Sequence, residues 1–313
     1  MNVAEKRKGK AGRQARQQQS TQRQIPSGTY IEGRRAAAEA LRTGFPVKRA
    51  LVAKGLEQDR DIARLTDELA AANIQVKYVP RAQLDALSSH GAHQGIVLET
   101  APFPYATIQD VIAHAGDGPA LVVVLDHVTD AGNFGAIVRS AEVVGAAGVV
   151  VAKTRAAGVG VGAYKTSAGA VMHLPIAQVP NLASALDQLK EAGFWVGGAT
   201  EHAHDLVWDA PVHGRLALVM GSEGSGISRL VRERCDFEFR LPQRGRVESL
   251  NVAQATTAIA YEWLRRCMTG GADASEGAVA DVPSDGEGLD YDGYGSDFPD
   301  TSDFDFSDGE GRG

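Results

Sequence analysis

The sequence has little cysteine, no long apolar run and no apolar segment near its start. Cys235 and Cys267 are the only cysteines among 313 residues and lack CxxC spacing. This argues against a zinc site or a disulfide framework and favours a reducing cytoplasm. No stretch approaches the roughly 20 consecutive apolar residues of a membrane span, and the basic, Gln-rich start does not resemble a secretory signal. We therefore expect a cytoplasmic protein without a membrane partner.

The net charge of −7 is distributed unevenly along the chain. Residues 1–24 hold seven Lys or Arg and one Glu, whereas residues 271–313 hold thirteen Asp or Glu and one Arg, which leaves −1 for residues 25–270. Charge blocks with few apolar residues are typical of disordered segments. We predict a basic disordered arm at 1–27, which either binds nucleic-acid phosphates without sequence preference or only keeps the chain soluble. We predict an acidic disordered tail at 271–313, which either solubilises the chain or mimics RNA.

Strands alternate with helices over residues 28–99 and again from Pro119 to about Met268, which predicts two α/β domains. Pro102 and Pro104 lie between them and exclude a continued helix. We predict a small domain at 28–100, a linker at 101–118 and a larger domain at 119–270 with a mostly parallel, helix-covered sheet. The expected strands are 49–53, 74–79, 94–99, 120–125, 148–151, 194–199 and 216–220. The expected helices are 32–41, 59–72, 136–144, 181–191 and 250–267.

Three separated segments of the larger domain could carry chemistry. The first, Leu125 to Gly145, runs from the end of a buried strand through a polar loop into the predicted helix, and contains Asn133 and Arg139. Loops at the carboxyl ends of parallel strands form ligand sites. The second, Leu218 to Ser228, places Glu223 among three glycines that allow close backbone approach. The third, Leu241 to Ala253, contains Asn251 and Ser249, which we predict as the N-cap of the last helix.

Each segment also has an ordinary explanation when it is taken alone. Arg139 could be a surface arginine, Glu223 a solvated acid, and Ser249 and Asn251 simple caps. A dinucleotide fingerprint is absent, and Tyr164 interrupts the phosphate-loop pattern at 158–166, which disfavours a nucleotide-binding enzyme. The eight histidines form no recognisable metal-binding motif, so we expect no metal.

Taken together and in order, the three segments resemble the SpoU/TrmH family (SPOUT superfamily) of RNA 2′-O-ribose methyltransferases. The matching text is NFGAIVRSAEVVG, then LALVMGSEGSGIS, then LPQRGRVESLNVAQAT. Residues 28–99, with YIEGRRAAAEAL and HQGIVLE, resemble the family's small substrate-binding domain. The resemblance covers about 240 residues, and the layout is similar to the RlmB-like enzymes, which methylate a guanosine ribose of 23S rRNA.

The resemblance implies a trefoil-knotted α/β methyltransferase domain, a homodimer, and S-adenosylmethionine held by the knot loops. It implies that Thr200, Gly221, Leu241 and Leu250 contact the cofactor. The residues that match the family's catalytic and substrate positions are Asn133, Arg139, Glu223, Ser249 and Asn251. A ribose 2′-hydroxyl is a poor nucleophile, so the catalyst must orient it and assist proton removal. Arg139 is expected to bind the neighbouring phosphate and, as proposed for the family, to help take the proton.

Two departures from the family's usual text affect the substrate. Asp130-Ala131 stands where the family usually has Asp-Pro, and Gln243-Arg244 and Glu248 replace smaller or apolar residues. The resemblance leads us to expect 2′-O-methylation of a guanosine in 23S rRNA. Because of these departures, we keep two alternatives within the family, a tRNA substrate and resistance-type rRNA methylation. The alternative from another class is a non-catalytic RNA-binding factor for ribosome assembly. The complete set of candidate catalytic residues argues against it.

Overall fold

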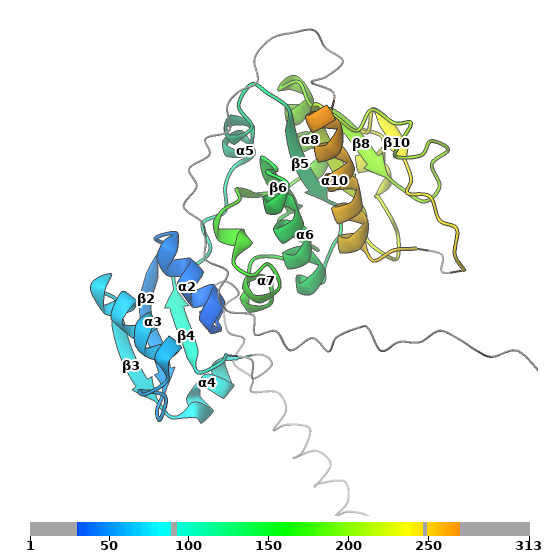
Figure 1. Ribbon diagram of the computed structural model, residues 1–313. Helices are drawn as coiled ribbons and strands as arrows, with labels where there is room; N and C mark the ends of the chain where they lie inside the picture. The colour runs from blue at the N-terminus through cyan, green and yellow to red at the C-terminus, as the bar shows by residue number, and fades with distance from the viewer. Residues whose placement is uncertain (1–29, 89–92, 247–248, 270–313) are drawn as a thin grey trace, which may run out of the picture. The chain divides into compact units, whose positions relative to one another are not determined.

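The computed structural model describes residues 30–88, 93–246 and 249–269, which form two β-sheets with their helices (Figure 1). The predicted basic arm and acidic tail lie outside the described residues, so their roles remain predictions. No helix in the described ranges is both long and apolar enough to cross a membrane.

The N-terminal sheet has four strands in the order β1-β4-β2-β3. Strands β2 and β3 are parallel, and the other pairs are antiparallel. Its elements are β1 (Tyr30–Glu32), α2 (Arg34–Arg42), β2 (Val47–Ala53), α3 (Arg60–Ala71), β3 (Gln75–Val79), α4 (Arg81–Leu87) and β4 (Ile96–Thr100). The helix predicted from Glu32 begins at Arg34, because Gly33 has a φ of 96° that an α-helix does not allow and Glu32 pairs with β4.

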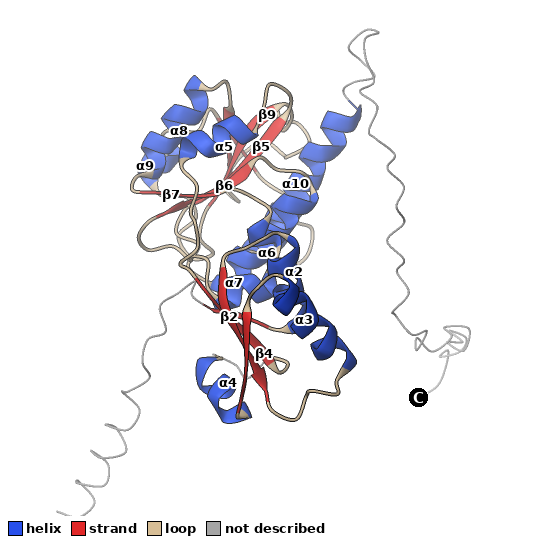
Figure 2. Cartoon of the chain, turned by 90° about the vertical axis from the view of Figure 1, so that its left-hand side faces the viewer, coloured by secondary structure: helices blue, strands red, loops and turns tan. Residues whose placement is uncertain are grey.

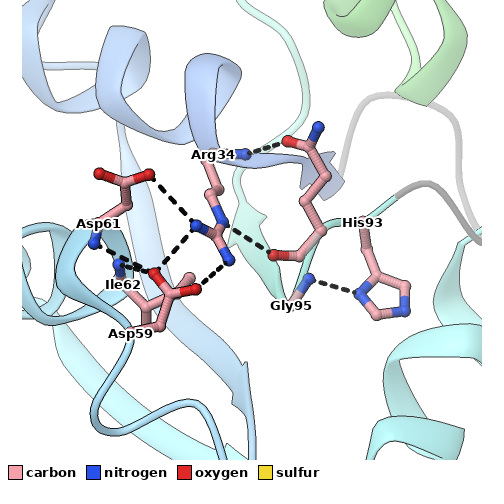
Figure 3. Close-up of polar contacts among 7 residues, drawn as sticks. Arg34, Asp59, Asp61, Ile62, His93 and Gly95 are labelled. Carbon is pink, nitrogen blue, oxygen red and sulfur yellow. Dashed lines mark hydrogen bonds and ion pairs between the residues drawn. The ribbon is translucent and has the colours of Figure 1, made fainter.

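Arg34 ties three segments of this domain together (Figure 3). Its guanidinium donates to both carboxylate oxygens of Asp59 at 2.9 and 2.7 Å, and its Nε donates to the Gln94 carbonyl at 3.2 Å. Asp59 is the N-cap of α3, and its hydrogen bond with Arg34 holds the pKa of this carboxyl below its usual value. Next to Gln94, the buried Nδ1 of His93 accepts from the Gly95 amide at 3.0 Å. These hydrogen bonds hold the HQG segment, residues 93–95, in place at the start of β4.

The larger sheet has six strands, all parallel, in the order β10-β8-β9-β5-β6-β7. The strands are β5 (Ala120–Leu125), β6 (Gly148–Ala152), β7 (Ile176–Val179), β8 (Trp195–Ala199), β9 (Arg215–Met220) and β10 (Phe237–Phe239). The predicted parallel, helix-covered architecture is confirmed, and β5 has the predicted bounds. β5 is buried along its whole length, as expected for a central strand covered on both faces. The trefoil knot remains a prediction.

Two groups of helices cover opposite faces of this sheet (Figure 2). The helices are α5 (Ile108–His114), α6 (Ala131–Val143), α7 (Val161–Thr166), α8 (Leu182–Glu191), α9 (Arg229–Arg232) and α10 (Val252–Thr269). Helices α5, α8 and α9 pack on the strand positions represented by Val122 and Val124. Helices α6, α7 and α10 pack on the alternate positions, represented by Leu121 and Val123. This alternation follows from the two-residue period of a strand.

One helix was not predicted from the sequence, and the starts of α6 and α10 differ from the prediction. Helix α5 lies within the segment predicted as a linker and begins with a capping box between Thr107 and Asp110. Helix α6 begins at Ala131 and not at 136, because the Asp130 side chain accepts from the Asn133 amide at 2.7 Å. The prediction of Ser249 as the last N-cap is wrong. Helix α10 begins at Val252, and the Asn251 side chain accepts a hydrogen bond from the Ala253 amide at 2.9 Å.

Candidate active site

A cavity of about 290 Å³ lies at the carboxyl ends of β8 and β9, beside the start of α10. Such a position is typical of ligand sites in parallel sheets. All four residues predicted to contact the cofactor line it: Thr200, Gly221, Leu241 and Leu250. Ser249 and Glu223 also line it. Segments that are far apart in the sequence therefore meet at one cavity.

Gly221 is the point at which the chain turns sharply after β9. The next residue, Ser222, exchanges two backbone hydrogen bonds with Gly226, at 3.1 and 2.9 Å. A Cβ at position 221 would lie 2.2 Å from the carbonyl carbon of Gly226. Only glycine allows this hairpin to fold back against its own strand. The hairpin projects Glu223 towards the starts of α6 and α10.

Glu223, Asn133 and Asn251 form one hydrogen-bonded cluster. Asn251 Nδ2 donates to Glu223 Oε1 at 2.8 Å and to Asn133 Oδ1 at 2.9 Å. Asn133 Nδ2 donates to the same Glu223 oxygen at 3.2 Å. One residue from each of the three candidate segments thus contributes to the cluster. The carboxylate orients both amides, because a carboxylate only accepts hydrogen bonds.

Arg139 lies away from this cluster within the single chain. It is exposed on α6 and does not line the cofactor cavity. Six residues after Asn133, it lies on a different face of the helix, because an α-helix repeats every 3.6 residues. Its neighbour Ser140 hydrogen-bonds Thr257 of α10 at 2.7 Å between the hydroxyl oxygens. The structure therefore joins Asn133, Glu223 and Asn251 in one cluster, places Ser249 on a cavity wall that Glu223 shares, and leaves Arg139 apart.

A second cavity, of about 170 Å³, shares the Ser222–Gly224 wall with the first. Asn133, Asp130 and His127 line it. The sequence analysis did not single out His127 or the buried Asp126 that contacts its ring at 2.6 Å. The signal that could have found them is the polar pair directly after the buried strand β5.

An ion pair lies at one wall of the larger cavity. Arg232, which lines the cavity, donates to both carboxylate oxygens of Glu238 on β10, and the Nη2–Oε2 distance is 2.6 Å. This hydrogen bond lowers the pKa of Glu238 and raises that of Arg232.

Burial raises the pKa of the Cys235 thiol to about 12, which argues against a role of this thiol as a nucleophile.

The cavity fits S-adenosylmethionine by the chemistry of its walls. Leu241, Leu250 and Ile259 offer apolar surface for an adenine ring, and the 221–226 hairpin offers backbone groups at close range. A side chain at Gly221 would remove that approach. Among the described residues, no group of three or more His, Cys, Asp or Glu is arranged to hold a metal ion.

Two family models match the chain. The SpoU rRNA methylase family matches residues 120–261, and the RNA 2′-O ribose methyltransferase substrate-binding family matches residues 30–106. The limits of 28–100 and 119–270 that the sequence suggested for the two domains remain predictions.

Relatives and a solved structure agree with these matches. An uncharacterised tRNA/rRNA methyltransferase of Mycolicibacterium vanbaalenii is 38% identical over 82% of both chains. YacO of Bacillus subtilis, named as a TrmH family tRNA/rRNA methyltransferase, is 38% identical over 76% of this chain and 95% of its own. The crystal structure of the SpoU methyltransferase AviRb of Streptomyces viridochromogenes with AdoMet has a TM-score of 0.67 and 27% identity, covering 76% of this chain and 90% of that one. The chain therefore belongs to the SpoU/TrmH family of S-adenosylmethionine-dependent RNA 2′-O-ribose methyltransferases.

Proposed function

We propose that this enzyme methylates the ribose 2′-hydroxyl of a guanosine in 23S rRNA, in the cytoplasm. The observation that carries the methyl transfer is the cluster of Asn133, Glu223 and Asn251 at the wall shared by the two cavities. The guanosine of 23S rRNA is taken from the resemblance of the sequence to the RlmB-like enzymes. In the proposal the larger cavity binds the methyl donor through Thr200, Gly221, Leu241 and Leu250. The smaller cavity accepts the ribose.

S-adenosylmethionine supplies a methyl group that departs from a positively charged sulfur. The protein's task is to hold the ribose oxygen in line with it and to keep water out. We assign this positioning to Asn133 and Asn251, with Glu223 as the group that orients both amides. Ser249, on the wall of the larger cavity, would bind the ribose or the donor.

Arg139 would bind the phosphate next to the target ribose, and its place on α6 suggests that it does so across a homodimer. Val143 follows one turn after Arg139, so both lie on the same face of α6. Val143 is 58% exposed, and Tyr261 on the adjoining helix α10 is 50% exposed. In the proposal, a second copy covers these apolar side chains and Arg139 serves the partner's site.

Mixing two inactive variants tests this arrangement. In a symmetric dimer with a shared site, Arg139→Ala and Glu223→Ala subunits together restore one complete site per mixed dimer, or about a quarter of wild-type activity after full exchange. If Arg139 acts within its own subunit, the mixture stays inactive. Light scattering of the wild type and of Val143→Asp shows whether α6 holds the dimer.

The target is tested by mapping 2′-O-methylated riboses in total RNA from cells with and without the gene. We expect one guanosine of 23S rRNA to lose its methyl group and to regain it with the wild-type gene but not with Glu223→Ala. The names of the relatives favour a tRNA target as the second candidate, so the tRNA fraction is mapped as well. A methyl group lost only from tRNA would replace the proposed substrate.

A further inference from the structure

His127 is held by a buried carboxylate at the end of β5. Its Nδ1 lies 2.6 Å from Oδ1 of Asp126, which is only 1% exposed. The other oxygen of Asp126 accepts from the Ser228 amide at 2.6 Å. Because Ser228 closes the loop that carries Glu223, the carboxylate has a fixed position relative to the cluster. The imidazole is therefore oriented by the protein and not by solvent.

The contact with Asp126 also sets the tautomer of the ring. A carboxylate only accepts hydrogen bonds, so Nδ1 of His127 carries the hydrogen and Nε2 of the neutral ring keeps its lone pair. The side chain is 42% exposed and lines the smaller cavity together with Asn133 and Glu223. The backbone of His127 has a φ of 59°, a left-handed conformation that histidine adopts more readily than most residues.

The other ionisable groups of the two cavities are less suited to accept a proton. Arg139 lines neither cavity within its own chain. Asp130 caps α6, and Glu223 accepts from two amides. Among the described residues that line a cavity, the other histidine is His202, which borders only the larger one.

We propose that His127, oriented by Asp126, accepts the proton of the ribose 2′-hydroxyl; this role rests on the function proposed above. The 2′-oxygen forms a bond to the methyl carbon as the carbon–sulfur bond of the sulfonium breaks. The sulfur keeps the electron pair and becomes a neutral thioether. The hydroxyl proton passes to Nε2 of His127, where the imidazolium is balanced by Asp126, and it then leaves to water. Arg139 keeps the positioning role.

The pH dependence of the methyl-transfer rate distinguishes a proton acceptor from a phosphate-binding cation at His127. The ionisable groups that contact the ring or share its cavity are Asp126, Asp130 and Glu223. Proton acceptance needs the neutral imidazole, so the single-turnover rate should rise with pH. A phosphate contact by His127 would need the cation and would give the opposite slope.

His127→Asn is the matched variant. Asparagine tolerates the left-handed backbone, and its Nδ2 can donate to Asp126 in place of the ring nitrogen, but it has no atom that takes up a proton. His213→Asn is the control, because His213 is exposed and precedes β9 at the opposite end of the strand from Gly221. Both variants are assayed as full-length protein on RNA purified from cells that lack the gene.

We expect His127→Asn to lower the single-turnover rate by about 100-fold and to abolish the rise with pH. Its affinity for S-adenosylmethionine, measured by calorimetry, should stay within about twofold of wild type, since the larger cavity is untouched. Imidazole added to His127→Gly should restore part of the rate. His213→Asn should match the wild type in rate and in profile.

The proposal is overturned if His127→Asn keeps the rise with pH and a rate within about threefold of wild type. It is also overturned if the variant changes only the Michaelis constant for RNA, because that result assigns His127 to binding. A wild-type enzyme that transfers no methyl group to any RNA fraction contradicts the proposed function instead. The two failures are therefore distinguishable.

Discussion

Replacing Gly221 by alanine tests whether the hairpin after β9 forms the cofactor site. The new Cβ would lie 2.2 Å from the carbonyl carbon of Gly226 and 2.4 Å from the amide nitrogen of Ile227. Carbon atoms in contact are about 3.5 to 4.0 Å apart. The neighbouring atoms belong to the backbone, so no side-chain rotation relieves the overlap. The hairpin must move by more than about 1 Å.

Overpacking of this kind costs about 1–3 kcal/mol. If the hairpin moves outward in the free protein, binding of S-adenosylmethionine must bring it back to its wild-type position. The cost of that movement then appears as a 5- to 150-fold loss of affinity for S-adenosylmethionine. If the hairpin cannot move, the cost appears in the free energy of unfolding. Either way, the two paired hydrogen bonds between Ser222 and Gly226 are weakened.

The assay combines calorimetric titration with S-adenosylmethionine and urea denaturation of the same samples. Gly118→Ala is the control, because a Cβ at position 118 meets nothing within 4 Å and the residue precedes β5, away from the cavity. We expect the control to bind like the wild type. Unchanged affinity and unchanged stability in Gly221→Ala would refute the argument that the close approach at this glycine builds the site.

Three further predictions address the active site, stability and RNA binding. Arg139→Ala should abolish methyl transfer but retain S-adenosylmethionine binding, since Arg139 lies outside the larger cavity; near-wild-type turnover would remove it from the mechanism. The pKa of Glu262 is lowered to about 2, chiefly by its hydrogen bond with Arg265, so its stabilisation is present above about pH 4.5 and is lost as the pH falls towards 2. Glu262→Gln should therefore cost about 1 kcal/mol at pH 7 and less than about half of that at pH 3, by denaturation at both pH values; an equal difference at both would contradict the ion pair. Deleting residues 1–24 should reduce the salt dependence of RNA binding. An unchanged slope of log K against log salt would show that the basic arm does not contact RNA phosphates.

Patterns within single elements were sufficient for much of the fold. The apolar run at 120–125 predicted β5 with its observed bounds, because a strand buried on both faces leaves a continuous apolar signature. The helix predicted at 181–191 matches α8 to within one residue, and Asn181 caps it by accepting a hydrogen bond from the Ser184 amide. The three motifs likewise identified Asn133, Glu223 and Asn251, which meet at the candidate site, together with Arg139, which does not.

Short elements and helix starts depended on their surroundings. Strands β7 and β10 have four and three residues, too few for a periodic signal, and they exist as strands because they pair with β6 and β8. The first turn of α6 contains Gly132 and Asn133, weak helix formers, and the cap at Asp130 decides where it begins.

The sequence by itself determined which side chains are available for chemistry, since motifs record residue types and their order. Only the tertiary structure decided which of them meet. Glu223 and Asn133 are 90 residues apart and become hydrogen-bonded because β9 and β5 are adjacent parallel strands whose carboxyl ends share one edge. The same geometry turns Arg139 away from the cluster and gives His127 a place beside Glu223 in the smaller cavity. Distances across a sheet depend on strand order, which no local pattern in the sequence specifies.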